Sequence, residues 1–141
     1  MKPILTGLLL WAWSLFACAD PTLSVENAWV REAPPSARML AAYMTLRNTG
    51  AEEQVLIAVE SPAFTHVMLH RSEVVDGVAR MTHQDRVVIP AHGSVALEPG
   101  GLHLMMPASQ ARLTAGERVE FILKFADGSS IRAQADVRKK P

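Results

Sequence analysis

The chain has 141 residues, which is enough for one domain, and its 14 basic and 14 acidic side chains balance. A formal net charge of zero gives no overall field that would attract nucleic acid or an acidic substrate, so we expect no nucleic-acid partner. Cys18 is the single cysteine. An intrachain disulfide framework is therefore excluded, and stability must come from a core of ordinary size.

The N-terminal segment is typical of a secretory signal. A positive start at Met1-Lys2 precedes an apolar run over residues 4–16 and the small residues Ala17-Cys18-Ala19. We expect a signal peptide over residues 1–19, cleaved after Ala19, and a folded domain over residues 20–141. Two alternatives stay open. In the first, residues 15–18, which also resemble a bacterial lipobox, are cleaved before Cys18, and that residue is lipidated. In the second, the segment stays uncleaved as an anchor.

The remainder of the chain predicts an all-β fold. Short apolar or alternating runs are separated by turns rich in Pro, Gly, Asn and Asp, and no window of 11 or more residues has a convincing helical period. Such spacing is typical of a β-sandwich or barrel. The predicted strands are residues 23–31, 39–47, 54–59, 64–72, 78–83, 87–89, 94–97, 102–106, 118–126 and 130–137.

Four candidate metal ligands lie in the second half of the chain: His70, Met81, His103 and Met105. Ten residues separate the first pair, twenty-one separate Met81 from His103, and one lies between His103 and Met105. Thioether sulfur is a poor ligand for Zn²⁺, Ca²⁺ or Mg²⁺ and a good one for Cu(I). If the four side chains meet in space, their chemistry favours Cu(I).

The predicted hairpin indicates how the first two ligands could meet. A two-residue turn at Asp76-Gly77 pairs Val75 with Val78, and counting back pairs Ser72 with Met81. His70 then lies on the same face as Met81 as a diagonal neighbour, within reach of one ion. His103 and Met105 are two residues apart on a strand, so they also share a face. A longer loop would shift this register.

Other His, Met and aromatic residues are weaker candidates, because a Met in a strand usually fills the core and a single His is usually structural or exposed. His66 and Met68 fall on the His70 face if that strand is regular, and His83 would lie opposite His70. We interpret these three as neighbours of the site. His92 is predicted to be exposed in a turn. Trp29 and Tyr43 are interpreted as packing residues, with the alternative that either covers a metal site.

With these residues in place, the chain resembles the PCu(A)C family of periplasmic copper chaperones. The family signature is a His, ten residues, a Met, twenty-one residues, and His-x-Met, which His70, Met81, His103 and Met105 reproduce. Residues 28–31, 42–50 and 97–105 also agree with the family. The resemblance implies a cupredoxin-like Greek-key β-sandwich that binds one Cu(I) through these four side chains. The tail from Ala126 onward contains neither His nor Met, so the second, tail-based site of some relatives is not expected.

The sequence therefore predicts a monomeric, exported copper carrier of the periplasm and not an enzyme. The resemblance implies a copper-accepting partner, such as a Sco-type protein or a cytochrome c oxidase subunit, with membrane contact only through a lipid on Cys18. Copper buffering or resistance is an alternative, and a metal-free interaction sandwich is a further one. An electron-transfer cupredoxin needs a Cys ligand, which residues 20–141 lack. Paired carboxylates, a Ser-His-Asp set and a phosphate loop, which would favour an enzyme, were not found in the sequence.

Overall fold

The computed structural model describes residues 21–108 and 112–139. The predicted signal peptide, residues 1–19, and its alternative cleavage point lie outside these residues. Within them, the structure contains no helix that is long and apolar enough to cross a membrane. The described strands are β1 (Leu23–Arg31), β2 (Met39–Asn48), β3 (Gln54–Glu60), β4 (Met68–Val75), β5 (Val78–His83), β6 (Val87–Ile89), β7 (Gly93–Leu97), β8 (Leu102–Pro107), β9 (Arg118–Phe125) and β10 (Ser130–Arg138).

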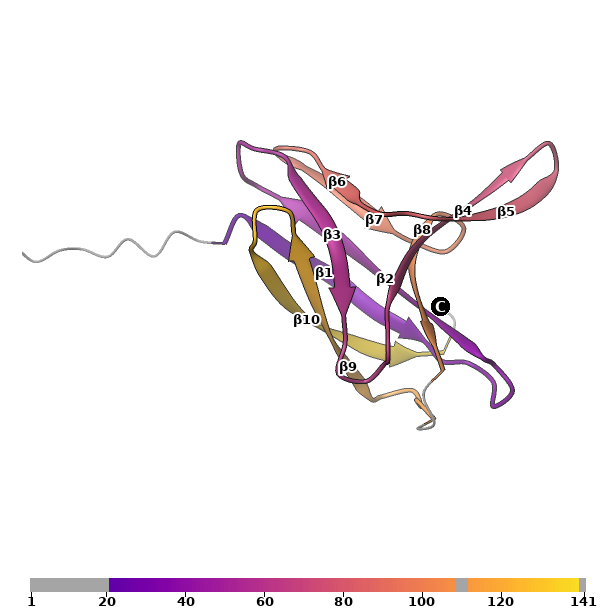
Figure 1. Cartoon of the computed structure of the whole chain (residues 1–141). Helices are drawn as coiled ribbons and strands as arrows, with labels where there is room; N and C mark the ends of the chain where they lie inside the picture. The colour runs from indigo at the N-terminus through magenta and orange to yellow at the C-terminus, as the bar shows by residue number, and fades with distance from the viewer. Residues whose placement is uncertain (1–20, 109–111, 140–141) are drawn as a thin grey trace, which may run out of the picture.

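The strands form one continuous sheet that folds back on itself (Figure 1). Its order is β5-β4-β8-β2-β1-β10-β9-β3-β6, and β7 also pairs with β2. The long strand β2 serves two partners, because its first half pairs with β8 and its second half pairs with β7. β3 then lies against β4, and β6 against β7, which brings the two ends of the path together around a core.

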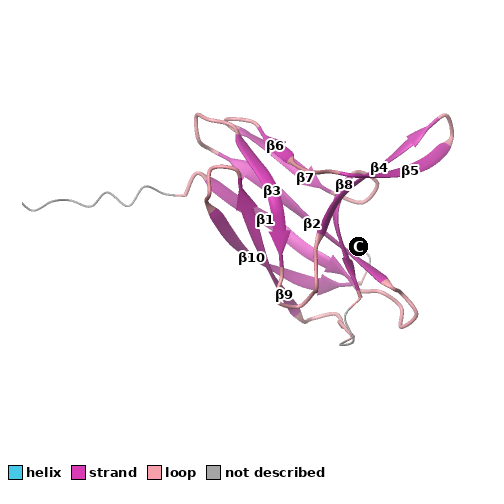
Figure 2. Cartoon of the chain, in the orientation of Figure 1, coloured by secondary structure: helices cyan, strands magenta, loops and turns pink. Residues whose placement is uncertain are grey.

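Because the sheet folds back on itself, it forms two layers, and the core lies between them. It consists of every second side chain along the strands. In β9, Val119, Phe121, Leu123 and Phe125 are buried, as their alternation in the sequence predicts. Leu104 of β8 and Leu69 of β4 join the same cluster. Strand dominates the described chain (Figure 2). The predicted all-β sandwich is therefore confirmed.

The fourth predicted strand is partly wrong. The sequence predicted a strand over residues 64–72, whereas β4 spans Met68–Val75. Ser61 explains the late start: its hydroxyl donates to the Glu120 carbonyl at 2.6 Å and accepts from the Ala63 amide at 3.3 Å. This turn directs Phe64 onto Phe121, with 6.4 Å between ring centroids. The ends of the other nine strands agree with the sequence prediction to within one residue.

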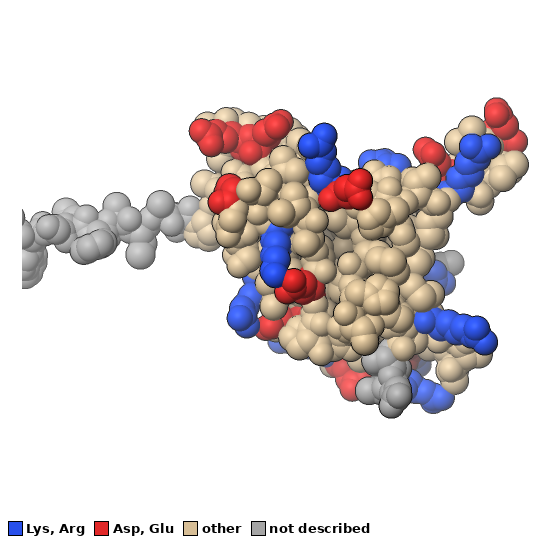
Figure 3. Space-filling model, viewed as in Figure 1, with Lys and Arg blue, Asp and Glu red and all other residues tan. Residues whose placement is uncertain are grey.

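Charged side chains of both signs are intermixed on the face seen in Figure 3, with apolar and uncharged surface between them. The ion pairs that the structure forms are on the surface, such as Lys124 with Glu60 at 2.6 Å and Arg47 with Glu26 at 2.8 Å. Exposed pairs of this kind contribute little to stability. The fold therefore rests on its apolar core.

Candidate metal centre

The candidate ligands lie on three neighbouring strands, because β4 pairs with β5 on one side and with β8 on the other. His70 is in register with His103 of β8, and Met68 is in register with Met105 two positions along the same pair of strands. Partners in an antiparallel pair point to the same side of the sheet, so these four side chains share the face opposite Leu69 and Leu104. The sheet thus brings His70 beside His103 and Met105, which are more than thirty residues away from it in the sequence.

The hairpin turn supplies the fourth predicted ligand. Asp76 and Gly77 have φ of 53° and 75°, the pair of positive values that a two-residue type I′ turn requires. Val75 pairs with Val78 and Ser72 with Met81, so the predicted register is confirmed. Met81 is therefore a diagonal neighbour of His70 on the same face.

His83 completes a row of three histidines. It pairs directly with His70, which in turn pairs with His103, so the three imidazoles occupy one register position across β5, β4 and β8. The ring centroid of His70 is 5.6 Å from that of His83 and 6.0 Å from that of His103. Counting from the turn predicted His83 opposite His70. The position of His103 depends on long-range pairing, which the sequence did not reveal.

The hydrogen bonds of the two predicted imidazole ligands leave nitrogen free for a metal. His103 Nδ1 lies 3.0 Å from the Gly101 carbonyl oxygen. A carbonyl only accepts, so Nδ1 carries a proton, and in the neutral ring the lone pair that a metal needs is then on Nε2. His70 Nδ1 is buried and has no hydrogen-bond partner among the described residues. An unpaired buried nitrogen is costly, and bonding to a metal ion would remove that cost. These residues therefore fit a metal site.

His70 is also poised to stay neutral. Burial lowers the pKa of its imidazole, and the neighbouring charges of His103 and His83 lower it further. A neutral imidazole is the form that binds metal, since protonation removes the lone pair. Protons therefore compete less at His70 than at an isolated histidine.

The four candidate ligands differ in exposure from one side of the row to the other. His103 is 5% exposed, His70 and Met105 are partly buried, and Met81 is 52% exposed. Three of the four candidate ligands thus lie within the body of the sheet, while Met81 is on the outer strand of a hairpin that projects from the body (Figure 1). An ion held here would be accessible from the Met81 side.

An apolar groove of about 280 Å³ adjoins Met105 on the same side of the sheet. Met39, Ala41 and Tyr43 of β2 contribute to its lining. Tyr43 is buried and packs against Trp29, with 4.6 Å between ring centroids, which agrees with the packing role predicted for both. An apolar surface therefore continues from Met105 across β2.

Two other histidines lie apart from the row. His66 precedes β4, is exposed, and has its Nδ1 3.2 Å from the Thr65 hydroxyl. The expectation that it shares the His70 strand is wrong, because the strand begins at Met68. His92 is exposed in a turn, as predicted, with φ of 51°.

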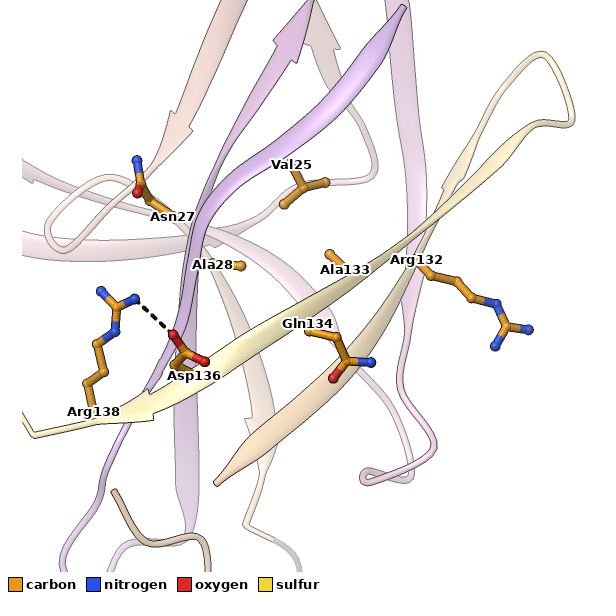
Figure 4. Close-up of a pocket in the computed structure, with 8 residues that line it drawn as sticks. All are labelled: Val25, Asn27, Ala28, Arg132, Ala133, Gln134, Asp136 and Arg138. Atoms are coloured by element: carbon orange, nitrogen blue, oxygen red, sulfur yellow. Dashed lines mark hydrogen bonds and ion pairs between the residues drawn. The ribbon is translucent and has the colours of Figure 1, made fainter. Parts of the chain in front are cut away.

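A larger recess of about 410 Å³ lies elsewhere, between β1 and β10 (Figure 4). Asn27, with φ of 51°, lies in its lining, at the point where the register of β1 with β2 shifts. Its charged groups are already paired: Asp136 accepts from Arg138 at 3.2 Å and also lies 3.2 Å from Arg118. The recess contains none of the four predicted ligands, so it is not the candidate site.

In their present positions, no three His, Cys, Asp or Glu side chains of residues 21–108 and 112–139 converge closely enough to hold a metal ion. A metal site on this face therefore needs the Met sulfurs, or a rotation of the exposed side chains. Met81 and Met105 lie beside the His70–His103 pair and can supply that sulfur. The donor set has the soft and borderline character that suits copper.

The fold is a cupredoxin-like Greek-key β-sandwich of the PCuAC type, as the sequence resemblance implied. The chain belongs to the LpqE-like family, described as putative lipoprotein LpqE-like, whose model matches residues 23–137.

Individual relatives agree with this assignment. The chain is 32% identical over 109 residues to the putative lipoprotein Lxx21020 of Leifsonia xyli subsp. xyli, an alignment that covers 77% of this chain and 64% of that protein. It is similar to the solution structure of CuI-DR1885 from Deinococcus radiodurans, with 35% identity, a TM-score of 0.69, and coverage of 88% and 83% of the two chains. The copper-bound PCuAC domain from PmoF2 shares the fold at 22% identity, with a TM-score of 0.70 and coverage of 86% and 97%.

Proposed function

We propose that this chain is an exported copper carrier that binds one Cu(I) through His70, Met81, His103 and Met105. The observation that carries the proposal is the placement of two imidazoles and two thioethers on one face of three adjacent strands. Cu(I) binds neutral nitrogen and sulfur donors of this kind, and thioethers do not oxidise to disulfides outside the cytoplasm. The copper forms of DR1885 and of the PmoF2 domain support copper as the cargo.

The exposure of the site supports transfer to a partner over storage. Copper in a closed core would have to wait for the body of the protein to open. Here Met81 is 52% exposed on the projecting hairpin, so a partner's ligand can approach the ion from that side. We infer that the acceptor is a copper protein of the same compartment, such as a Sco-type protein or the copper centre of cytochrome c oxidase. General copper buffering would use the same ligands without such an acceptor.

Export is part of the same proposal. The apolar N-terminal segment supports translocation to the periplasm, and the lipoprotein names of the family and of Lxx21020 support an anchor at Cys18. Mass spectrometry of the protein isolated from cells distinguishes a chain beginning at Asp20 from one that begins at lipidated Cys18. An N-terminus at Met1 would contradict both forms.

The decisive test is a Cu(I) titration against a competing chelator, combined with X-ray absorption to count sulfur and nitrogen neighbours. We expect one Cu(I) with two sulfurs and two nitrogens. Met81→Leu removes a sulfur while keeping an exposed apolar side chain of similar size, and should weaken binding sharply. His103→Ala should do the same. Met39→Leu, which changes an exposed Met outside the ligand set, is the matched control.

Unchanged Cu(I) affinity in both ligand variants would overturn the site. A coordination sphere of oxygen and nitrogen alone would also overturn it, and failure of the wild-type protein to retain copper would favour a metal-free interaction domain. Transfer is tested separately by mixing the Cu(I) protein with an apo acceptor and following the metal. Retention by the carrier at equilibrium would favour buffering.

A further inference from the structure

The row of three histidines has more donors than the proposed Cu(I) site uses. β5 carries Met81 and His83 two residues apart, so both project from the same face toward His70. Met81 is opposite Ser72, while His83 is opposite His70 itself. One strand therefore offers either a thioether or an imidazole to an ion bound at His70.

We propose, building on the copper-carrier function, that His83 replaces Met81 as the ligand from β5 when the bound ion is Cu(II). The ion is then held by the imidazoles of His70, His83 and His103, and the two thioethers no longer define the site. Imidazole suits Cu(II), whereas soft thioether sulfur suits Cu(I), so the oxidation state decides which side chain of β5 binds. No electron transfer within the protein is required, because each ion is bound in the state in which it arrives.

The geometry allows this exchange with little rearrangement. The His70 ring centroid is 5.6 Å from that of His83 and 6.0 Å from that of His103, and directly paired side chains on adjacent strands have their Cβ atoms about 4.5–5.5 Å apart. The three rings do not converge as they stand. His83 is the ring that must turn, and nothing holds it firmly. Its side chain is 57% exposed, and its Nε2 lies 3.5 Å from Asp85, whose own side chain is 97% exposed.

The other two imidazoles are already suited to bind. His103 keeps Nε2 free because Nδ1 donates to Gly101, and the buried His70 Nδ1 has no hydrogen-bond partner in the described part of the chain. The ring of His103 on β8, which is buried and hydrogen-bonded, thus has the least freedom, and the ring of His83 on the outer strand β5 has the most. An ion can stay on His70 and His103 while the β5 ligand changes.

The test compares His83→Gln with Met81→Leu in two titrations of the purified protein. Cu(I) is titrated under reducing conditions, and Cu(II) is titrated as the chloride against a weak chelator, with electron paramagnetic resonance to count bound nitrogens. His83→Gln should lower Cu(II) affinity by at least about tenfold and remove one nitrogen, since losing even a hydrogen-bond partner of a metal ligand costs about 10–100-fold. Its Cu(I) affinity should be unchanged. Met81→Leu should show the opposite pattern.

His66→Gln is the matched control, because it removes an exposed histidine that lies outside the row. It should leave both titrations unchanged. The proposal is overturned if wild-type protein binds no Cu(II), if His83→Gln keeps the wild-type Cu(II) affinity and nitrogen count, or if either β5 variant weakens both ions equally. A failed Cu(I) titration with an intact three-nitrogen Cu(II) signal would instead contradict the Cu(I) carrier function.

Discussion

β9 and β5 are both strands of antiparallel hairpins, and they are built in opposite ways. β9 alternates strictly, with every second residue buried from Val119 to Phe125. All six residues of β5 are exposed. The β9–β10 hairpin is part of the sandwich, whereas the β4–β5 hairpin extends away from it (Figure 1).

The two strands therefore have different roles: β9 stabilises the fold, whereas β5 carries the candidate ligand Met81. β9 buries apolar area, and burial of apolar area is the main favourable term in folding. β5 buries almost none, so its pairing with β4 and its turn must hold it in place. An isolated two-stranded hairpin is marginally stable. The hairpin is therefore the part of the molecule that can adjust around an ion, while the body keeps His103 fixed.

Truncating the body core should have the largest effect on folding. Phe121 is completely buried, and Phe121→Ala should cost about 3–5 kcal/mol because it removes a ring and leaves a cavity. Val74, on the hairpin, is 72% exposed, and Val74→Ala should stay within about 0.5 kcal/mol. Urea unfolding of the apo protein measures both. Equal losses would show that the hairpin is as much a part of the cooperative core as β9 is.

The hydrogen bonds of the buried Asn48 side chain test how a polar group stabilises the body of the sandwich. Its side-chain amide donates to the carbonyls of Glu52 at 2.7 Å and Pro90 at 3.2 Å, and its oxygen accepts from the Gly50 amide at 2.9 Å. Asn48→Ala leaves these buried groups unpaired, so a loss of about 1–3 kcal/mol is expected. Cu(I) affinity should not change, because Asn48 ends β2 beside β7, whereas the first half of β2 is the part that pairs with β8 and Met105. The control is Thr49→Ala, whose exposed hydroxyl donates only to Thr22.

A turn variant tests the hairpin directly. Gly77 has φ of 75°, and Gly77→Ala places a side chain in the left-handed region at a cost of about 1–2 kcal/mol. The turn sets the position of Met81 on β5. The free-energy cost of straining the turn should therefore appear as a loss of Cu(I) affinity of roughly 5–30-fold. Global unfolding should change less, since the hairpin buries little.

Gly128 provides the matched control for the turn. It lies between β9 and β10 with φ of 87°, and, like Gly77, has no neighbouring atom that a Cβ would meet within 4 Å. Gly128→Ala should reduce stability and leave Cu(I) affinity unchanged. If both variants weaken copper binding equally, the effect comes from general destabilisation and not from the position of Met81.

The sequence was most informative where structure is local. The Asp76-Gly77 turn fixed the pairing of Ser72 with Met81 and of His70 with His83, because a two-residue loop leaves a single register. The alternation of residues 119–125 likewise predicted the buried face of β9. Both features depend on neighbouring residues alone.

The sequence was least informative where distant segments meet. The pairing of β4 with β8, which sets His70 beside His103, spans more than thirty residues, and no local pattern encodes it. The late start of β4 has a similar cause, because Ser61 is held by the Glu120 carbonyl. The four candidate ligands were predicted from their chemistry and spacing, and the row that includes His83 became visible only with the sheet order.

The smallest expected effect is a pH dependence that originates at His70. Burial and the charges of His103 and His83 lower its pKa in the folded protein, while in the unfolded chain it titrates near the ordinary value of about 6.5. The unfolded state therefore binds more protons as the pH falls below that value, and the apo protein loses stability until the folded-state pKa is passed. His70→Asn removes this contribution, so its Tm should fall less than that of the wild type between pH 7.5 and pH 5, both values chosen to bracket the ordinary His pKa of about 6.5. His66→Gln should retain the wild-type slope. An identical slope in His70→Asn would show that the pH dependence arises from other groups, and that the middle ring of the row is no harder to protonate than an exposed histidine.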